Sequence, residues 1–157
     1  LLSASAKRRI NARIAFTRGD FSGAHRLWRW PQDQPLCPAD QLMVAWLFPH
    51  KTSALLAKLR SLYPVNARLL QSHHLFEQGR LTQATVLMVD AFRLAQQHPW
   101  TFRPLLRQAF LNAKEIAQQN ARLGRLLFQT LKIKIIKNIL KAKPFGPHMQ
   151  LSIKNNQ

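Results

Sequence analysis

The sequence contains few side chains that could form a catalytic centre. Its six acidic residues lie far apart, at positions 20, 33, 40, 77, 90 and 115, and no two are spaced to place both carboxylates on one helical face. Acid–base chemistry by paired carboxylates therefore has no support. The five glycines are also dispersed, so there is no phosphate-binding glycine loop. We expect that this chain, taken by itself, is not an enzyme.

Histidine and cysteine residues do not indicate a metal site. The side chains of His73 and His74 would point about 100° apart on a helix, and no spacing typical of a zinc site surrounds them. Cys37 has no nucleophile motif around it, and we expect a small buried residue rather than a reactive thiol. The sequence therefore predicts no metal and no cofactor.

Basic charge is the strongest compositional signal. The 157 residues include 24 Lys or Arg and only 6 Asp or Glu, which gives a formal net charge of +18. Glu115 is the last acid, and from Arg122 onward every charged side chain is basic. Such an excess favours either a negatively charged partner or a solvated basic tail.

The segment 131–143 shows two competing patterns. Leu131 to Ile135 alternates as a strand does, whereas the later Ile and Leu residues recur at helical spacing. As a helix it would lie on an anionic membrane surface, or it would cap the fold with its lysines in water; both hypotheses stay open. We expect a kink near 130–133. The lysines that would bind an anionic surface are Lys132, Lys134, Lys137, Lys141 and Lys143.

Other features restrict the partner and the location. Nucleic acid is a less favoured partner than a membrane, because no helix-turn-helix, zinc-finger or RNA-recognition pattern accompanies the charge. The sequence has no run of 18 apolar residues and no signal-peptide pattern at its start. We therefore expect a cytoplasmic protein, with peripheral membrane association as the alternative.

Helical hairpins are expected to organise the chain. Around Gly19, apolar residues at helical spacing predict a helix, a tight turn and a second helix, with Gly19 left-handed and Asp20 capping the second helix. The same design returns 60 residues later around Gly79, with Ala12 on Ser72 and Ala24 on Ala84. We expect these small residues to let the two helices of each hairpin approach closely.

Further helices complete the predicted array. A middle hairpin is expected from a helix over 39–48, a turn over 49–51 and a helix over 52–62, with Thr52 or Ser53 as its N-cap. Tyr63 and Pro64 are expected to end that unit. Two more helices, over 102–119 and 120–131, would close the array.

These patterns resemble the tetratricopeptide repeat family. The resemblance covers roughly residues 5–100 and rests on Gly19-Asp20-Phe21-x-x-Ala24, on Gly79-Arg80-Leu81-x-x-Ala84 and on Pro64 at a junction. It implies paired antiparallel helices and a concave groove. At positions that line the groove in this family stand Arg9, Arg13 and His73, and basic residues there would hold an acidic or C-terminal peptide.

The sequence thus predicts an all-α, tetratricopeptide-like α-solenoid of helical hairpins with C-terminal capping helices over 1–131, followed by a basic amphipathic segment and flexible tail over 132–157. The expected function is a non-catalytic protein-protein interaction module, at the C-terminal end of a larger polypeptide. The alternative is a peripheral binder of anionic surfaces. An enzyme with its catalytic domain upstream of Leu1 is the third hypothesis.

Overall fold

The described part of the chain is entirely helical. The computed structural model describes residues 2–95, 97–98 and 101–131. None of these residues lies in a β-strand, so the all-α prediction is confirmed. The expectations for 132–157, including the kink and the lysine stripe, lie outside the described residues. In chain order the elements are α1 (Ala4–Arg18), α2 (Phe21–Leu27), α3 (Pro38–Leu47), the 3-10 helix η1 (Pro49–Lys51), α4 (Ser53–Leu62), α5 (Pro64–Glu77), α6 (Leu81–Leu94), α7 (Arg103–Gln119) and α8 (Ala121–Leu131).

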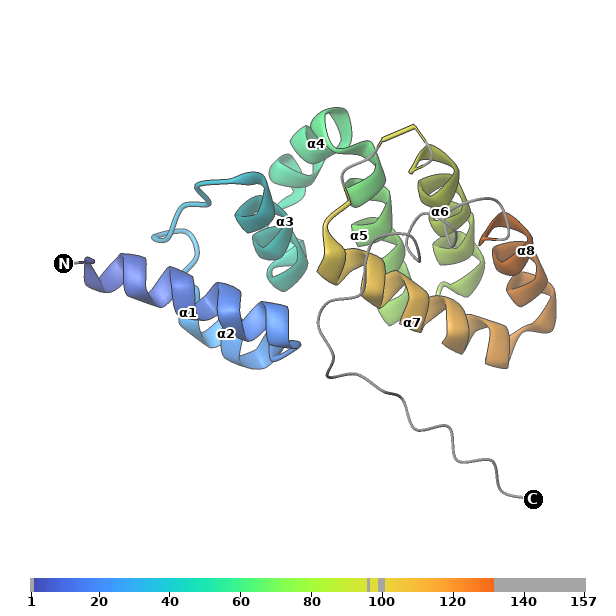
Figure 1. Ribbon diagram of the computed structural model, residues 1–157, viewed down its shortest axis with the longest axis horizontal. Helices are drawn as coiled ribbons and strands as arrows, with labels where there is room; N and C mark the ends of the chain where they lie inside the picture. Colours follow the sequence, from blue (N-terminus) through green and yellow to red (C-terminus); the bar gives the residue numbers. More distant parts are fainter. Residues whose placement is uncertain (1, 96, 99–100, 132–157) are drawn as a thin grey trace, which may run out of the picture.

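Consecutive helices pair as hairpins. The closest pairs are α1 with α2, α5 with α6, and α7 with α8. The last two hairpins lie side by side, because α5 packs on α7 and α6 packs on α8 (Figure 1). Helices α3 and α4 both pack against α5, and α1 and α2 lie at the other end of the molecule from α8 (Figure 1).

The two glycine turns form as predicted. Gly19 has φ 87° and Gly79 has φ 73°, a left-handed conformation that costs glycine little because it has no Cβ. Asp20 then caps α2, and its carboxylate accepts the backbone N–H of Gly23 at 2.8 Å. The sequence therefore located both the end of α1 and the start of α2.

Small residues lie where the paired helices meet. Those predicted for this role are fully buried: Ala12, Ala24, Ser72 and Ala84. The Ser72 hydroxyl donates to the Ala84 carbonyl at 2.9 Å, so α5 and α6 are in direct contact there. The α7–α8 hairpin also has a small residue at its helix contact, because a Cβ added to Gly124 would lie 2.8 Å from the Cβ of Ala117.

Ala84→Leu is expected to lower the free energy of unfolding by about 1 to 3 kcal/mol, because the larger side chain must force α5 and α6 apart. Urea denaturation of the full chain measures the change. The matched control is Val86→Leu on the same helix, whose side chain is about half exposed and should tolerate the change. An Ala84→Leu protein as stable as its parent would contradict this packing.

The middle unit differs from the prediction in two details. Thr52 occupies the N-cap position of α4, but its hydroxyl makes no capping bond and donates instead to the Phe48 carbonyl at 2.8 Å. Pro64 does not simply end the unit: it is the first residue of α5, where its missing N–H costs nothing. Tyr63 alone therefore separates α4 from α5.

No helix in the described ranges combines the length and the apolar character that crossing a bilayer requires.

Candidate functional site

Arg13 forms an ion pair within the chain. Both oxygens of the Asp40 carboxylate contact the Arg13 guanidinium, and the distance from Nη2 to Oδ2 is 2.6 Å. Asp40 is fully buried at the start of α3 and also accepts the backbone N–H of Leu36 at 3.0 Å. The hydrogen bond to Asp40 raises the pKa of Arg13. This pair connects α1 to α3.

Asp33 makes a second connection to α1. Its buried carboxylate accepts the Ser5 hydroxyl at 2.8 Å and the backbone N–H of Arg29 at 3.1 Å, and Arg8 lies 3.4 Å away. Burial by itself raises the pKa of a carboxylate, but these hydrogen bonds, together with the charges of Arg8 and Arg9, outweigh it and hold the pKa of Asp33 below its ordinary value. Two of the six acids are thus used to hold α1 in place.

The three predicted groove residues are not brought together as a carboxylate clamp. Arg13 already holds the Asp40 carboxylate, Arg9 is half-buried near Asp33, and His73 lies on α5 against the Trp46 ring. A clamp requires free cations that face one cavity, and Arg13 does not supply one. The acidic-peptide groove stays a prediction. A different candidate site lies beside Trp46.

An aromatic cluster joins the N-terminal hairpin to the rest of the molecule. The Phe16 ring contacts Phe21 and Trp46 edge-on, at centroid distances of 5.2 and 5.1 Å, and stacks on Phe102 at 6.1 Å. Trp46 in turn stacks on Phe21 at 4.9 Å and meets His73 at 4.6 Å. The cluster fixes the ends of α2 and α3 relative to α5.

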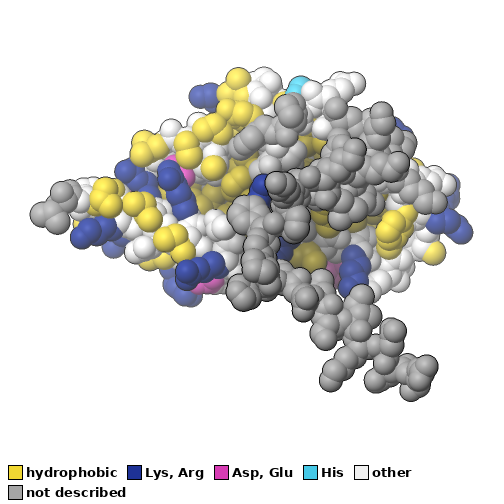
Figure 2. All heavy atoms as spheres, viewed as in Figure 1, with side chains coloured by type: hydrophobic (Ala, Val, Ile, Leu, Met, Phe, Trp, Pro, Cys, Tyr) yellow, Lys and Arg dark blue, Asp and Glu magenta, His cyan; other side chains and the backbone are white. Residues whose placement is uncertain are grey.

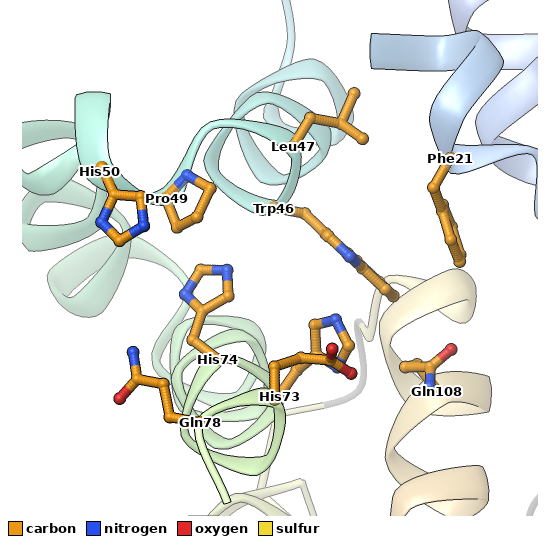
Figure 3. A pocket seen from close by; sticks show the side chains of 10 residues that line it. Phe21, Trp46, Leu47, Pro49, His50, His73, His74, Gln78 and Gln108 are labelled. Carbon is orange, nitrogen blue, oxygen red and sulfur yellow. The ribbon is translucent and has the colours of Figure 1, made fainter.

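A pocket of about 530 Å³ opens beside this cluster. Aromatic and imidazole rings form half of the described lining: Phe21, Trp46, His50, His73 and His74. The remaining residues are apolar Leu47 and Pro49 and polar Glu77, Gln78 and Gln108. Figure 3 shows that these side chains come from α2, α3, η1, α5, the residue after α5 and α7, with the two adjacent histidines of α5 facing the end of α3.

A chain of hydrogen bonds orients the polar wall of the pocket. The Gln108 amide donates to the Asn112 side-chain oxygen at 2.8 Å, and the Asn112 amide lies 3.2 Å from Nδ1 of His73. In the tautomer that carries its proton on Nε2, the neutral His73 ring accepts a hydrogen bond from this amide at Nδ1. With its NH₂ group engaged in this way, Gln108 keeps its amide oxygen as an acceptor.

Both histidines of α5 are neutral at pH 7. Burial lowers the pKa of His73 from 6.5 to about 4. Burial also lowers the pKa of His74 to about 4, with a smaller contribution from the neighbouring His73. The pocket therefore presents uncharged imidazoles at neutral pH.

Within the described ranges, no three His, Cys, Asp or Glu side chains lie close enough to hold a metal ion. Cys37 is half-buried rather than buried, and its sulfur lies 3.7 Å from Nη2 of Arg13.

Basic side chains mark both ends of the molecule (Figure 2). One group lies over α1 at the left of this view, and another lies at the right, where α8 is found. On α8, the exposed side chains include Arg122, Arg125 and Phe128, and the Phe128 side chain is 59% exposed.

Comparison with known protein families, curated proteins and solved structures finds no match for this chain.

Proposed function

We propose that the chain is a non-catalytic interaction module of the tetratricopeptide-like kind, and that it holds a short segment of a partner protein in the pocket beside Trp46. The observation that supports this most directly is the pocket itself. Its volume of about 530 Å³ lies within the range of binding sites that enclose a ligand. It also combines an apolar aromatic floor with a few oriented polar groups, as such sites do.

The position of the pocket fits this role. It lies where α2, α3, α5 and α7 come together, so its walls belong to packed helices and not to a long loop. The aromatic cluster around Phe16 and the hydrogen bonds through Asn112 hold the side chains that line the pocket in place before a ligand binds. Preorganisation of this kind lowers the entropy cost of binding.

A titration of the full, isotope-labelled chain with blocked pentapeptides tests the proposal. Each peptide carries one variable side chain between glycines, chosen to be acidic, basic, aromatic or aliphatic. We expect at least one class to cause saturable chemical-shift changes at Trp46, His73 and His74. Exposed Leu111 on the outer side of α7 should not respond. If no class shifts the pocket resonances, the proposal is wrong.

Filling the pocket should abolish this binding. In Gln108→Trp the new ring occupies the pocket, whereas Lys114→Trp places the same ring on the exposed side of α7. We expect the first variant to lose at least tenfold in peptide affinity and the second to keep it, as measured by the same titration. Equal binding by both variants would place the peptide elsewhere.

The anionic-surface function is a second proposal, supported by α8. Arg122 and Arg125 stand beside exposed Phe128 on its outer face, and the lysine-rich residues from Lys132 onward follow directly in sequence. Each basic residue near an anionic surface contributes on the order of 1 kcal/mol. We expect sedimentation with phosphatidylserine vesicles to fall at least tenfold in Arg122→Gln plus Arg125→Gln. Undiminished binding would exclude α8 from the contact.

A further inference from the structure

The pocket differs in charge from the rest of the chain. The whole sequence carries 24 Lys or Arg residues, yet the described residues that line the pocket include no Lys or Arg. Glu77 is the one acidic residue among the described residues of the lining. In the described ranges, no Lys or Arg nitrogen forms an ion pair with the Glu77 carboxylate. The pocket is thus a locally negative site on a strongly basic protein.

Two helix ends add to this negative character. Helix α3 ends at Leu47 and α5 ends at Glu77, and both residues line the pocket. The C-terminal end of a helix carries a partial negative charge, equivalent to about half an electron, because its last carbonyl groups have no partner within the helix. Cations are stabilised at such ends. The N-terminal end of the short helix α2, at Phe21, opposes one of these ends, so the Glu77 carboxylate makes the balance negative.

The walls of the pocket suit a flat cation. Trp46 projects from α3, whereas His73 and His74 project from α5, so rings from two helices line the pocket, and the close-up shows Gln78 and Gln108 at its margins (Figure 3). A planar guanidinium group stacks on aromatic rings and donates to carboxylate and amide oxygens at the same time, whereas a lysine ammonium acts as a compact point charge. The Glu77 carboxylate and the Gln108 amide oxygen supply acceptors of these two kinds.

From this charge and geometry we infer that the pocket receives the guanidinium group of an arginine in the partner segment. The inference rests on the proposed function and specifies its ligand. It also reverses the charge expected from Arg9 and Arg13, which predicted an acidic peptide. The +18 charge of the chain opposes the approach of a basic partner, but at physiological ionic strength charges more than about 8 Å away are largely screened.

Paired peptides test this inference. Isothermal titration of the full chain at 150 mM salt compares blocked pentapeptides with arginine, citrulline, leucine or glutamate at the centre. Citrulline keeps the shape of arginine but has no charge. We expect the arginine peptide to bind at least fivefold more tightly than the citrulline peptide. Citrulline or glutamate peptides that bind as tightly as the arginine peptide would overturn the inference.

A pair of variants identifies the carboxylate responsible. Glu77→Gln should reduce arginine binding to the level of citrulline, and Glu115→Gln on the exposed side of α7 should leave the preference unchanged. Circular dichroism shows whether each variant is folded. An undiminished preference for arginine in Glu77→Gln would contradict the inference.

The possible failures are distinguishable. Binding of the leucine or glutamate peptide without a preference for arginine would support the interaction module and contradict only the inference that its ligand is an arginine. If none of the four peptides binds, both the proposed function and the arginine inference are wrong. Free arginine that binds as tightly as the peptide would indicate a small-molecule site and would also overturn the inference.

Discussion

Asp40→Asn is expected to lower the free energy of unfolding by about 2 to 3 kcal/mol. The Asp40 side chain is fully buried and satisfies both the Arg13 guanidinium and the Leu36 N–H. In the variant, the Arg13 guanidinium lies beside a neutral amide. The NH₂ group of this amide is a donor, so it cannot accept the guanidinium N–H groups. The Arg13 side chain is 42% exposed, so water recovers part of the loss and the effect stays below that of a fully buried pair. Urea denaturation measures it.

Two further variants give this prediction its control. Glu115→Gln makes the same chemical change on an exposed side chain and should alter stability by less than about 0.5 kcal/mol. In an Arg13→Met background, Asp40→Asn should cost less than it does in the parent chain, because no cation is left without its partner. Equal costs in both backgrounds would show that the ion pair has no part in the effect.

Acid should destabilise the protein well before the buried Asp33 carboxylate, whose pKa is lowered, is protonated. His73 and His74 have a folded-state pKa of about 4 against the ordinary 6.5, so between these values the unfolded chain binds more protons than the folded one. Their contribution to stability is complete above about pH 6.5 and is lost as the pH falls towards 4. We expect the free energy of unfolding to drop by about 3 to 5 kcal/mol from pH 7 to pH 4.

Denaturation curves at several pH values, repeated on variants, attribute this loss to the two histidines. The double variant His73→Asn plus His74→Asn should show a much flatter profile between pH 7 and pH 4. Exposed His98→Gln should keep the parental profile, because its side chain is solvated. A double variant with the full parental pH dependence would show that other groups cause it.

Local signals in the sequence predicted most of the helices. Gly19 and Gly79 mark turns because each has a left-handed backbone, and Ala24 and Ala84 mark helix crossings because only small side chains fit there. Both properties depend on a few consecutive residues, and they can be recognised without tertiary information. The prediction of α7 and α8 succeeded for the same reason, since their apolar residues recur at helical spacing.

The site depended on contacts that no local pattern encodes. Phe21, Trp46, His73 and Gln108 come from four separate helices and meet only in the folded chain. The residue that neutralises Arg13 lies 27 positions away, beyond an irregular segment. His73 and His74 are adjacent in the sequence, but the contact of His73 with Trp46 of α3 forms only in the folded chain.

Intermolecular nuclear Overhauser effects between the arginine pentapeptide and the full, isotope-labelled chain test the central claim most directly. We predict cross-peaks from the arginine side-chain methylene protons to the rings of Trp46 and His74, and no cross-peaks to exposed Phe128 on α8. Cross-peaks to Phe128 or to α1, with none to the pocket rings, would contradict the claim that this pocket is the binding site.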